Sequence, residues 1–360
     1  MRILSVTTQR NEGPFLLEWL AWHRLLGVTD FLVYSNDCTD GSDALLDALA
    51  GHGVLRHQPN TAPPGKSVQW TALKRAWQDP LRKAADWMLV SDIDEFPVIH
   101  AGAGRLGDLM AAIPADADAD AVALPWRLFG SGGITGFEDR PVIQQFTRAA
   151  PPDLVYPIGA TLFKSLFRPV AFARPGVHRP RNRAEGGAKW ASGSGGLVGG
   201  SFAANDQNIW VLNQPDARAL AEMHHYSLRS AESFLLKSER GLPNRRDRPI
   251  DSGYWIERNF NTVENLAAHR LLPELLAGID ALKSLPGIAA RHQASVDWHR
   301  ARLAELLRDR PNIAFYAQLL MSPDTRPLPL DQQHRLLRRM SGAGNRGRPA
   351  FPLASRAVKG

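Results

Sequence analysis

Two aspartates separated by one residue, Asp92 and Asp94, follow a short apolar run and could bind a metal ion. The run itself, Trp87 to Val90, fits a strand that is buried on both faces. In an extended backbone, residues two apart point the same way, so we expect both carboxylates on one side and Ile93 in the core. Their oxygens suit Mg²⁺ or Mn²⁺, whose remaining ligands a diphosphate can supply. An isolated Asp-X-Asp is more often a polar strand end in which one carboxylate caps a helix, and here the preceding buried strand and the companion motifs favour the metal site instead.

The elements around this pair alternate between strand and helix, which indicates an α/β fold. The periodicity predicts strands at 2–8, 29–35, 54–57, 121–126, 142–147 and 161–167, and helices at 14–26, 44–49, 66–77 and 105–113. From residue 251 onward it predicts helices at 254–264, 270–283, 290–308 and 313–320. We therefore expect a sheet domain followed by a helical C-terminal region.

Polar side chains also follow the first two predicted strands. Thr8, Arg10, Asn11 and Glu12 follow the first strand, and Asp37 follows the second. Ligands of an open α/β sheet collect beyond the carboxyl ends of its strands, where loop N–H groups and polar side chains can meet a nucleotide. Helix capping alone would also explain these loops. Lys66 and Gln69, at the start of the helix predicted at 66–77, are further candidates for the nucleotide-sugar site. Asp92 completes this set.

The order of these motifs resembles that of the GT-A glycosyltransferases, specifically the family 2-like and family 92-like bacterial proteins. The resemblance rests on Arg10-Asn11-Glu12, on the segments 36–42 and 92–96, and on a His-Tyr, Ser, Phe, Lys, Arg-Gly pattern that ends near residue 241. It implies a GT-A fold, with a mixed, mainly parallel sheet flanked by helices. It also implies that the first loop and Asp37 hold the nucleoside, and that Asp92 and Asp94 hold the metal on the diphosphate.

A histidine from late in the domain could complete the metal's coordination beside the two aspartates. His225 is our first candidate and His178 our second. A lone histidine is more often structural, so this assignment depends on the aspartate pair.

An inverting transferase needs a general base near the acceptor hydroxyl. No spacing in the sequence identifies it, and the acidic candidates are Glu95, Glu138, Asp139 and Asp206. Glu95 could instead hold the metal ligands in place.

Composition places the chain among globular proteins, with 44% apolar and 22% charged residues. The net charge of +7 lies entirely in the C-terminal tail, because the segment 335–360 carries seven basic and no acidic residues. This distribution argues against a nucleic-acid partner. The tail is either solvated or makes peripheral contact with an anionic membrane. Without a signal-peptide pattern, the expected location is the cytoplasm, or the inner face of the membrane if the tail binds there.

These observations predict a transferase domain over residues 1–241, a helical region over 242–340 and a disordered basic tail over 341–360. The predicted activity is metal-dependent, inverting transfer of a sugar from a nucleotide-diphosphate sugar to a sugar or glycan hydroxyl, as in polysaccharide or glycoconjugate synthesis. The alternatives are a sugar-phosphate nucleotidyltransferase, a metal-dependent phosphoesterase and a non-enzymatic carbohydrate-binding protein. The transferase hypothesis predicts that Asp94→Asn abolishes metal-dependent nucleotide binding with little loss of fold.

Overall fold

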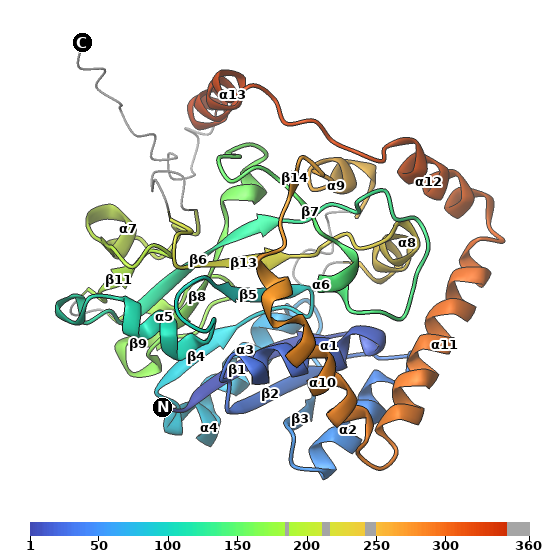
Figure 1. Cartoon of the computed structure of the whole chain (residues 1–360), viewed down its shortest axis with the longest axis horizontal. Coiled ribbons are helices and arrows are strands. Elements are labelled where there is room, and N and C mark those ends of the chain that lie inside the picture. The colour runs from blue at the N-terminus through green and yellow to red at the C-terminus, as the bar shows by residue number, and fades with distance from the viewer. Residues whose placement is uncertain (184–186, 211–216, 242–249, 344–360) are drawn as a thin grey trace.

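The structure, a computed structural model, describes residues 1–183, 187–210, 217–241 and 250–343. Within these ranges the chain forms one large mixed sheet with helices on both faces (Figure 1). Its strands run in the order β12-β11-β6-β8-β4-β1-β2-β3, and β13 joins β5 to β6. The ten strands are β1 (Ile3–Gln9), β2 (Asp30–Ser35), β3 (Arg56–Pro59), β4 (Trp87–Val90), β5 (Glu95–Ile99), β6 (Ala121–Leu128), β8 (Phe163–Phe167), β11 (Trp190–Ala191), β12 (Leu197–Val198) and β13 (Ala221–His225).

Two smaller sheets lie beside the main one. Each pairs two short antiparallel strands, which are β7 (Arg148–Ala149) with β14 (Val263–Glu264) and β9 (Phe172–Arg174) with β10 (Arg181–Asn182). Short 3-10 turns lie between other elements at Ala115–Ala117, Ile158–Thr161, Pro169–Ala171 and Ala267–Leu271.

Most helices of the sheet domain lie between successive strands of the chain, as is usual in an α/β fold. They are α1 (Gly13–Leu25), α2 (Ser42–Gly51), α3 (Val68–Gln78), α4 (Pro80–Ala84), α5 (Leu106–Ala112), α6 (Val142–Gln145), α7 (Gly200–Ala204) and α8 (Ala231–Arg240). The C-terminal helices are α9 (Ser252–Ile256), α10 (Leu272–Lys283), α11 (Ile288–Leu306), α12 (Arg310–Met321) and α13 (Leu330–Ala343).

The centre of the sheet is buried on both faces, as the apolar run at 87–90 predicts. In β4, Trp87 and Leu89 belong to one apolar cluster, whereas Met88 and Val90 belong to the cluster on the opposite face. Alternating residues of a strand point to opposite faces, so a strand covered on both sides reads as continuously apolar. The predicted fold class is therefore confirmed: a mixed sheet flanked by helices, with a helical C-terminal extension.

The C-terminal helices pack along one side of the sheet domain. Helix α10 contacts α1, α11 contacts α1, α2 and α8, and α12 contacts α8 and α9. Figure 1 shows them as the orange and red helices that run from α2 past α8 toward α9. At Gly13 an added Cβ would lie 2.3 Å from the Ser295 Oγ of α11, so this close approach requires glycine.

Two predicted elements are wrong. The segment 142–147, predicted as a strand, begins as helix α6, because Pro141 precedes it and the Glu18 carboxylate accepts the N–H groups of Val142 and Ile143. The helix predicted at 254–264 ends at Ile256, and the last two residues of the predicted segment, Val263 and Glu264, form β14.

Among the described helices, none combines the length and the apolar character that a membrane span needs. The tail beyond residue 343, including its predicted disorder and membrane contact, lies outside the described residues.

Candidate active site

The largest cavity that we describe has a volume of about 1470 Å³ and lies at the carboxyl ends of β1, β2 and β4. These three strands are parallel neighbours, with Gln9 beside Ser35 and Val6 beside Val90. The loops that follow them therefore meet at one edge of the sheet. The cavity is lined by several of the predicted site residues, which are Thr8, Arg10, Glu12, Asp37, Gln69, Asp92, Asp94, His178, Asp206 and His225.

The two aspartates reach this cavity from a turn, so the expectation of an extended backbone is wrong. Residues 93 and 94 form the turn, and the Glu95 N–H donates to the Asp92 carbonyl at 3.1 Å. The Glu95 carboxylate accepts the Asp92 N–H in return at 2.8 Å. Ile93 is only 2% exposed and packs in the core, as expected. The turn thus directs both carboxylates into one cavity and packs the side chain of Ile93 in the apolar core.

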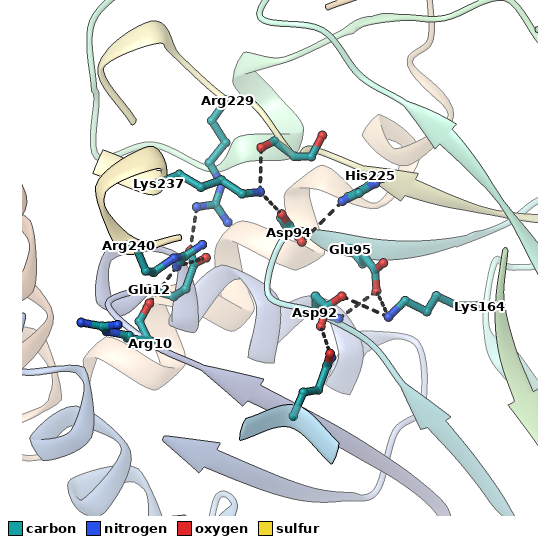
Figure 2. Close-up of polar contacts among 12 residues, drawn as sticks. Arg10, Glu12, Asp92, Asp94, Glu95, Lys164, His225, Arg229, Lys237 and Arg240 are labelled. Atoms are coloured by element: carbon teal, nitrogen blue, oxygen red, sulfur yellow. Dashed lines mark hydrogen bonds and ion pairs between the residues drawn. The ribbon is translucent and has the colours of Figure 1, made fainter. Parts of the chain in front are cut away.

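Asp92 is held by two neighbours of different charge. The Lys164 ammonium donates to its Oδ2 at 3.1 Å, and the Gln69 amide donates to its Oδ1 at 3.0 Å (Figure 2). Lys164 lies equally close, at 3.1 Å, to a Glu95 oxygen. A fully buried ammonium thus contacts both carboxyl groups, and these contacts compensate for the cost of its burial.

Glu95 does not line the cavity. Its side chain is fully buried, and burial raises its pKa to about 8 although the Lys164 charge opposes that shift. In the described part of the chain its second oxygen, Oε1, has no hydrogen-bond partner. Its contacts fix the backbone and side chain of Asp92, which is a positioning role.

Asp94 lies between a lysine and a histidine. The Lys237 ammonium donates to its Oδ2 at 2.7 Å, and His225 Nε2 lies 3.7 Å from its Oδ1 (Figure 2). Burial acts to raise the pKa of Asp94, but the charges of Lys237 and His225 outweigh it and hold that pKa well below its usual range. Asp94 is therefore a carboxylate at neutral pH, although it is only 7% exposed.

His225 reaches Asp94 because β13 pairs antiparallel with β5. His225 stands opposite Glu95 in this register, and the N–H of Tyr226 donates to the Asp94 carbonyl at 2.8 Å. The imidazole packs on Trp126, with ring centroids 4.1 Å apart. Burial lowers the pKa of His225 below its usual value, which favours the neutral imidazole that metal coordination requires. No described group bonds to its Nδ1.

His178 lines the same cavity but is engaged elsewhere. Its Nδ1 lies 3.0 Å from the Phe163 carbonyl oxygen, and burial together with the Lys164 charge lowers its pKa to about 3. Its ring also contacts Trp126, with centroids 5.3 Å apart. Both candidate histidines therefore contact the same tryptophan.

Of the candidate nucleotide-binding residues, Asn11 and Lys66 lie outside the lining of the large cavity. Asn11 lines a smaller adjacent pocket, and its side chain joins the first two loops through two hydrogen bonds with Thr39, at 2.8 and 3.0 Å. Lys66 is exposed in the loop that precedes α3. Glu12 lines the cavity, but its carboxylate is paired with Arg229 at 2.7 Å and with Arg240 at 2.5 Å. Asp37 is exposed at the cavity and has a left-handed backbone, with φ of 48°.

The four candidate bases are placed very differently. Asp206 lines the cavity, and both of its oxygens lie 3.1 Å from the Asn182 N–H. Glu138 pairs with Arg140 at the surface, and Asp139 pairs with His292 at 3.1 Å. Neither Glu138 nor Asp139 lines the cavity, because the loop that carries them packs toward α10 and α11.

The cations that contact the acidic residues are distant in the sequence. Lys164 is 72 residues from Asp92, Lys237 is 143 residues from Asp94, and Arg229 is 217 residues from Glu12. None of them was a candidate site residue, although Lys237 belongs to the His-Tyr, Ser, Phe, Lys, Arg-Gly pattern near residue 241. No local spacing could have identified them, because their placement depends on how β8, β13 and α8 pack against β4.

Comparisons with known proteins identify the family. A model of glycosyltransferase family 92 matches residues 3–191, slightly more than half of the chain. A family 92 protein of Ricinus communis is 26% identical over 155 residues, which is 40% of this chain and 26% of the relative. One from Oryza sativa subsp. japonica is 26% identical over 152 residues, or 41% and 25% of the two chains. The matched segment thus spans about a quarter of the plant proteins.

Solved glycosyltransferase structures are also similar, at low identity. The mannosyltransferase PcManGT from Pyrobaculum calidifontis, in complex with GDP-Man and Mn²⁺, is 13% identical with a TM-score of 0.34, covering 89% of this chain and 86% of its own. S. aureus TarS 1-349 in complex with UDP is 15% identical with a TM-score of 0.29, covering 48% of each chain.

The family match confirms the predicted resemblance to family 92 and the predicted enzyme class at family level. The relatives named above are plant proteins, so the bacterial subgroup stays a prediction. Because the match covers more than half of the chain, this protein belongs to glycosyltransferase family 92.

Proposed function

We propose that this protein transfers a sugar from a nucleotide-diphosphate sugar to an acceptor hydroxyl, with the help of Mn²⁺ or Mg²⁺. The observation that carries this proposal is the convergence on one cavity of the loops after β1, β2 and β4. These loops bring together the candidate nucleoside ligand Asp37 and the candidate metal ligands Asp92 and Asp94. Family membership supports the reaction class.

The candidate metal ligands fit a cation that the donor's diphosphate helps to hold. Asp92, Asp94 and His225 all line the cavity, and the buried His225 Nδ1 has no partner among the described groups. In the described ranges, however, no three His, Cys, Asp or Glu side chains form a complete cluster of ligands. Mg²⁺ sites commonly use one or two carboxylates together with substrate phosphates and water. We therefore assign Asp92, Asp94 and His225 to the ion, with His178 as the alternative imidazole.

A bound divalent ion would supply neutralising charge for the diphosphate that leaves. The side chains of this chain would position the reactants. Glu95 and Lys164 fix Asp92, and Lys237 fixes Asp94 while it also donates to the Ser227 carbonyl at 2.7 Å. Such held carboxylates keep their orientation when a substrate arrives, which preserves the geometry that catalysis needs.

The nucleotide would be held by the loops that precede α1, α2 and α3. We assign Asp37 to the nucleoside because its side chain is exposed at the cavity. Thr8, Arg10, Glu12 and Gln69 complete this part of the wall. Asn11 would act indirectly by joining the first two loops.

Transfer with inversion would need a carboxylate that accepts the proton of the attacking hydroxyl. Asp206 is the one of our four candidates that lines the cavity, so we propose it as the base. The test is the anomeric configuration of the product together with the loss of turnover in Asp206→Asn. A product that retains the donor's configuration would overturn this assignment.

The binding test is thermal melting with UDP, GDP or CDP, each with and without Mn²⁺. We expect one nucleoside diphosphate to stabilise the protein in a metal-dependent way. Asp37→Ala and Asp94→Asn should lose this stabilisation, whereas Asp43→Asn, an exposed aspartate at the start of α2, should keep it. Stabilisation by free sugar alone would instead support a carbohydrate-binding protein. Release of diphosphate from a nucleoside triphosphate and a sugar phosphate would support a nucleotidyltransferase.

A further inference from the structure

A second, smaller pocket of about 480 Å³ opens beside the large cavity. It lies between the β1–α1 loop, α8 and α11. Six residues line both this pocket and the large cavity: Arg10, Glu12, Lys237, Glu239, Arg240 and Arg302. Ligand pockets typically measure about 300–1,000 Å³, so it is large enough for a small group. Three residues proposed to hold the donor, Asp37, Gln69 and Asp92, do not line it, whereas Arg10 and Glu12 of the proposed nucleotide wall do.

Buried nitrogen donors without acceptors lie at this pocket. The Arg229 side chain is 8% exposed; its Nη1 donates to Glu12 at 2.7 Å, but its Nε and Nη2 have no partner within the described residues. The same holds for the buried Nε of Arg10 and for Nε2 of His299. A buried donor without an acceptor is destabilising, so a ligand that supplied oxygen acceptors would be bound favourably.

The charge of the lining indicates which acceptors fit. Five cationic side chains line the pocket against three carboxylates. Each of these carboxylates is already paired, Glu12 with Arg229 and Arg240, and Glu239 and Glu305 with Arg302. The guanidinium carbon of Arg229 also lies over Phe15, 3.4 Å from the ring centroid, which restrains the side chain. A restrained guanidinium whose Nε and Nη2 have no partner within the described residues suits the paired oxygens of an oxyanion.

From this geometry we propose that the pocket binds an acidic group, a phosphate or a carboxylate, carried by the acceptor. This inference rests on the proposed transfer reaction and specifies its acceptor as an anionic sugar or glycan. In Figure 2, Arg229, Arg240 and Glu12 lie on one side of Asp94, and Asp92 with Lys164 lies on the other. Lys237 lines both spaces and contacts Asp94, so an anion in the pocket lies next to the site where the metal and donor are proposed to bind.

The test is isothermal titration of the full chain with inorganic phosphate, with glucuronate and with glucose as the neutral control. We expect at least one of the two anions to bind and glucose not to bind. Arg229→Gln should weaken that binding roughly 10- to 100-fold, because it removes charge-assisted hydrogen bonds. Binding of phosphate alone would identify a phosphorylated acceptor, and binding of glucuronate alone would identify a uronic acid.

Two further variants keep the test decisive if Arg229→Gln does not fold. Arg302→Gln removes a half-buried cation that lines both spaces and leaves Glu239 and Glu305 without this partner, so it should also weaken anion binding. Arg300→Gln is the matched control, because Arg300 lies on α11 two residues earlier and does not line the pocket. Equal binding of the anion by wild type, Arg302→Gln and Arg300→Gln would overturn the proposal.

Competition then distinguishes an acceptor site from part of the donor site. The titration is repeated with saturating UDP or GDP and Mn²⁺, whichever stabilises the protein. Anion affinity that is unchanged, or increased, supports a separate acceptor site, whereas displacement by the nucleotide overturns it. If neither nucleotide stabilises the wild type but the anion still binds and depends on Arg302, the proposed donor function fails and the anion pocket stands.

Discussion

Replacing Asp94 by Asn should cost more stability than the sequence suggests. From the sequence alone, Asp94 is a surface ligand whose loss leaves the fold intact. In the structure it is 7% exposed and carries an ion pair of 2.7 Å with Lys237. Breaking a buried pair costs about 3–5 kcal/mol, because a charge remains buried without its partner. Lys237 keeps the Ser227 carbonyl and is partly solvated, so we expect a loss of about 2–3 kcal/mol.

The assay is urea denaturation of wild type, Asp94→Asn, Lys237→Met and the double variant, without nucleotide or metal. A double-mutant cycle should give a coupling energy of roughly 1.5–3 kcal/mol between the two positions. The loss should depend on pH with a defined sign. Because the pKa of folded Asp94 lies below its unfolded value of about 3.9, the pair contributes fully above that value and is lost as the pH falls through the folded pKa.

Two results would contradict this reasoning. If Asp94→Asn unfolds at the same urea concentration as wild type at pH 7, the pair with Lys237 contributes nothing. If the variant is equally destabilised at pH 7 and at pH 2.5, the loss has another cause than the carboxylate charge. Neither result would bear on nucleotide binding, which is measured separately by thermal melting with Mn²⁺.

Three further substitutions test other parts of the site and fold. Asp37→Ala should weaken binding of the stabilising nucleoside diphosphate roughly 10- to 100-fold while its urea midpoint falls only slightly, since Asp37 is exposed and only its left-handed backbone favours Asp over Ala; unchanged affinity would remove it from the site. Burial raises the pKa of Glu18 to about 7, above its unfolded value, so its contribution to stability is present at low pH and lost as the pH rises to 7. Glu18→Gln should therefore gain about 3 kcal/mol relative to wild type between pH 4 and 7, and parallel pH profiles would refute this. Gly13→Ala should lose about 1–3 kcal/mol through the clash with Ser295, and Ser295→Gly should recover part of that loss in the same unfolding assay.

How far the sequence predicts this protein depends on whether the information is local. The strand at 87–90 is found with its predicted bounds, and the strands beginning near residues 2 and 29 are found within one residue at each end. Apolar runs and capping residues determine such elements through contacts within a few residues. The predictions for 142–147 and 254–264 were wrong because contacts with distant groups determine the secondary structure there. One such group is the Glu18 carboxylate at the start of α6.

Local patterns in the sequence are enough to predict the alternation of strands and helices, the loops that follow the first two strands, and the acidic pair after β4. The charges that surround this pair are found only in the folded protein. The register of β13 on β5 places His225 beside Asp94, and the packing of α8 brings Lys237 to the same carboxylate. The folded structure also places Glu138 and Asp139 outside the lining of the large cavity. Pairing between strands and helices far apart in the chain is specified by the burial of whole surfaces, so no spacing within one segment encodes it.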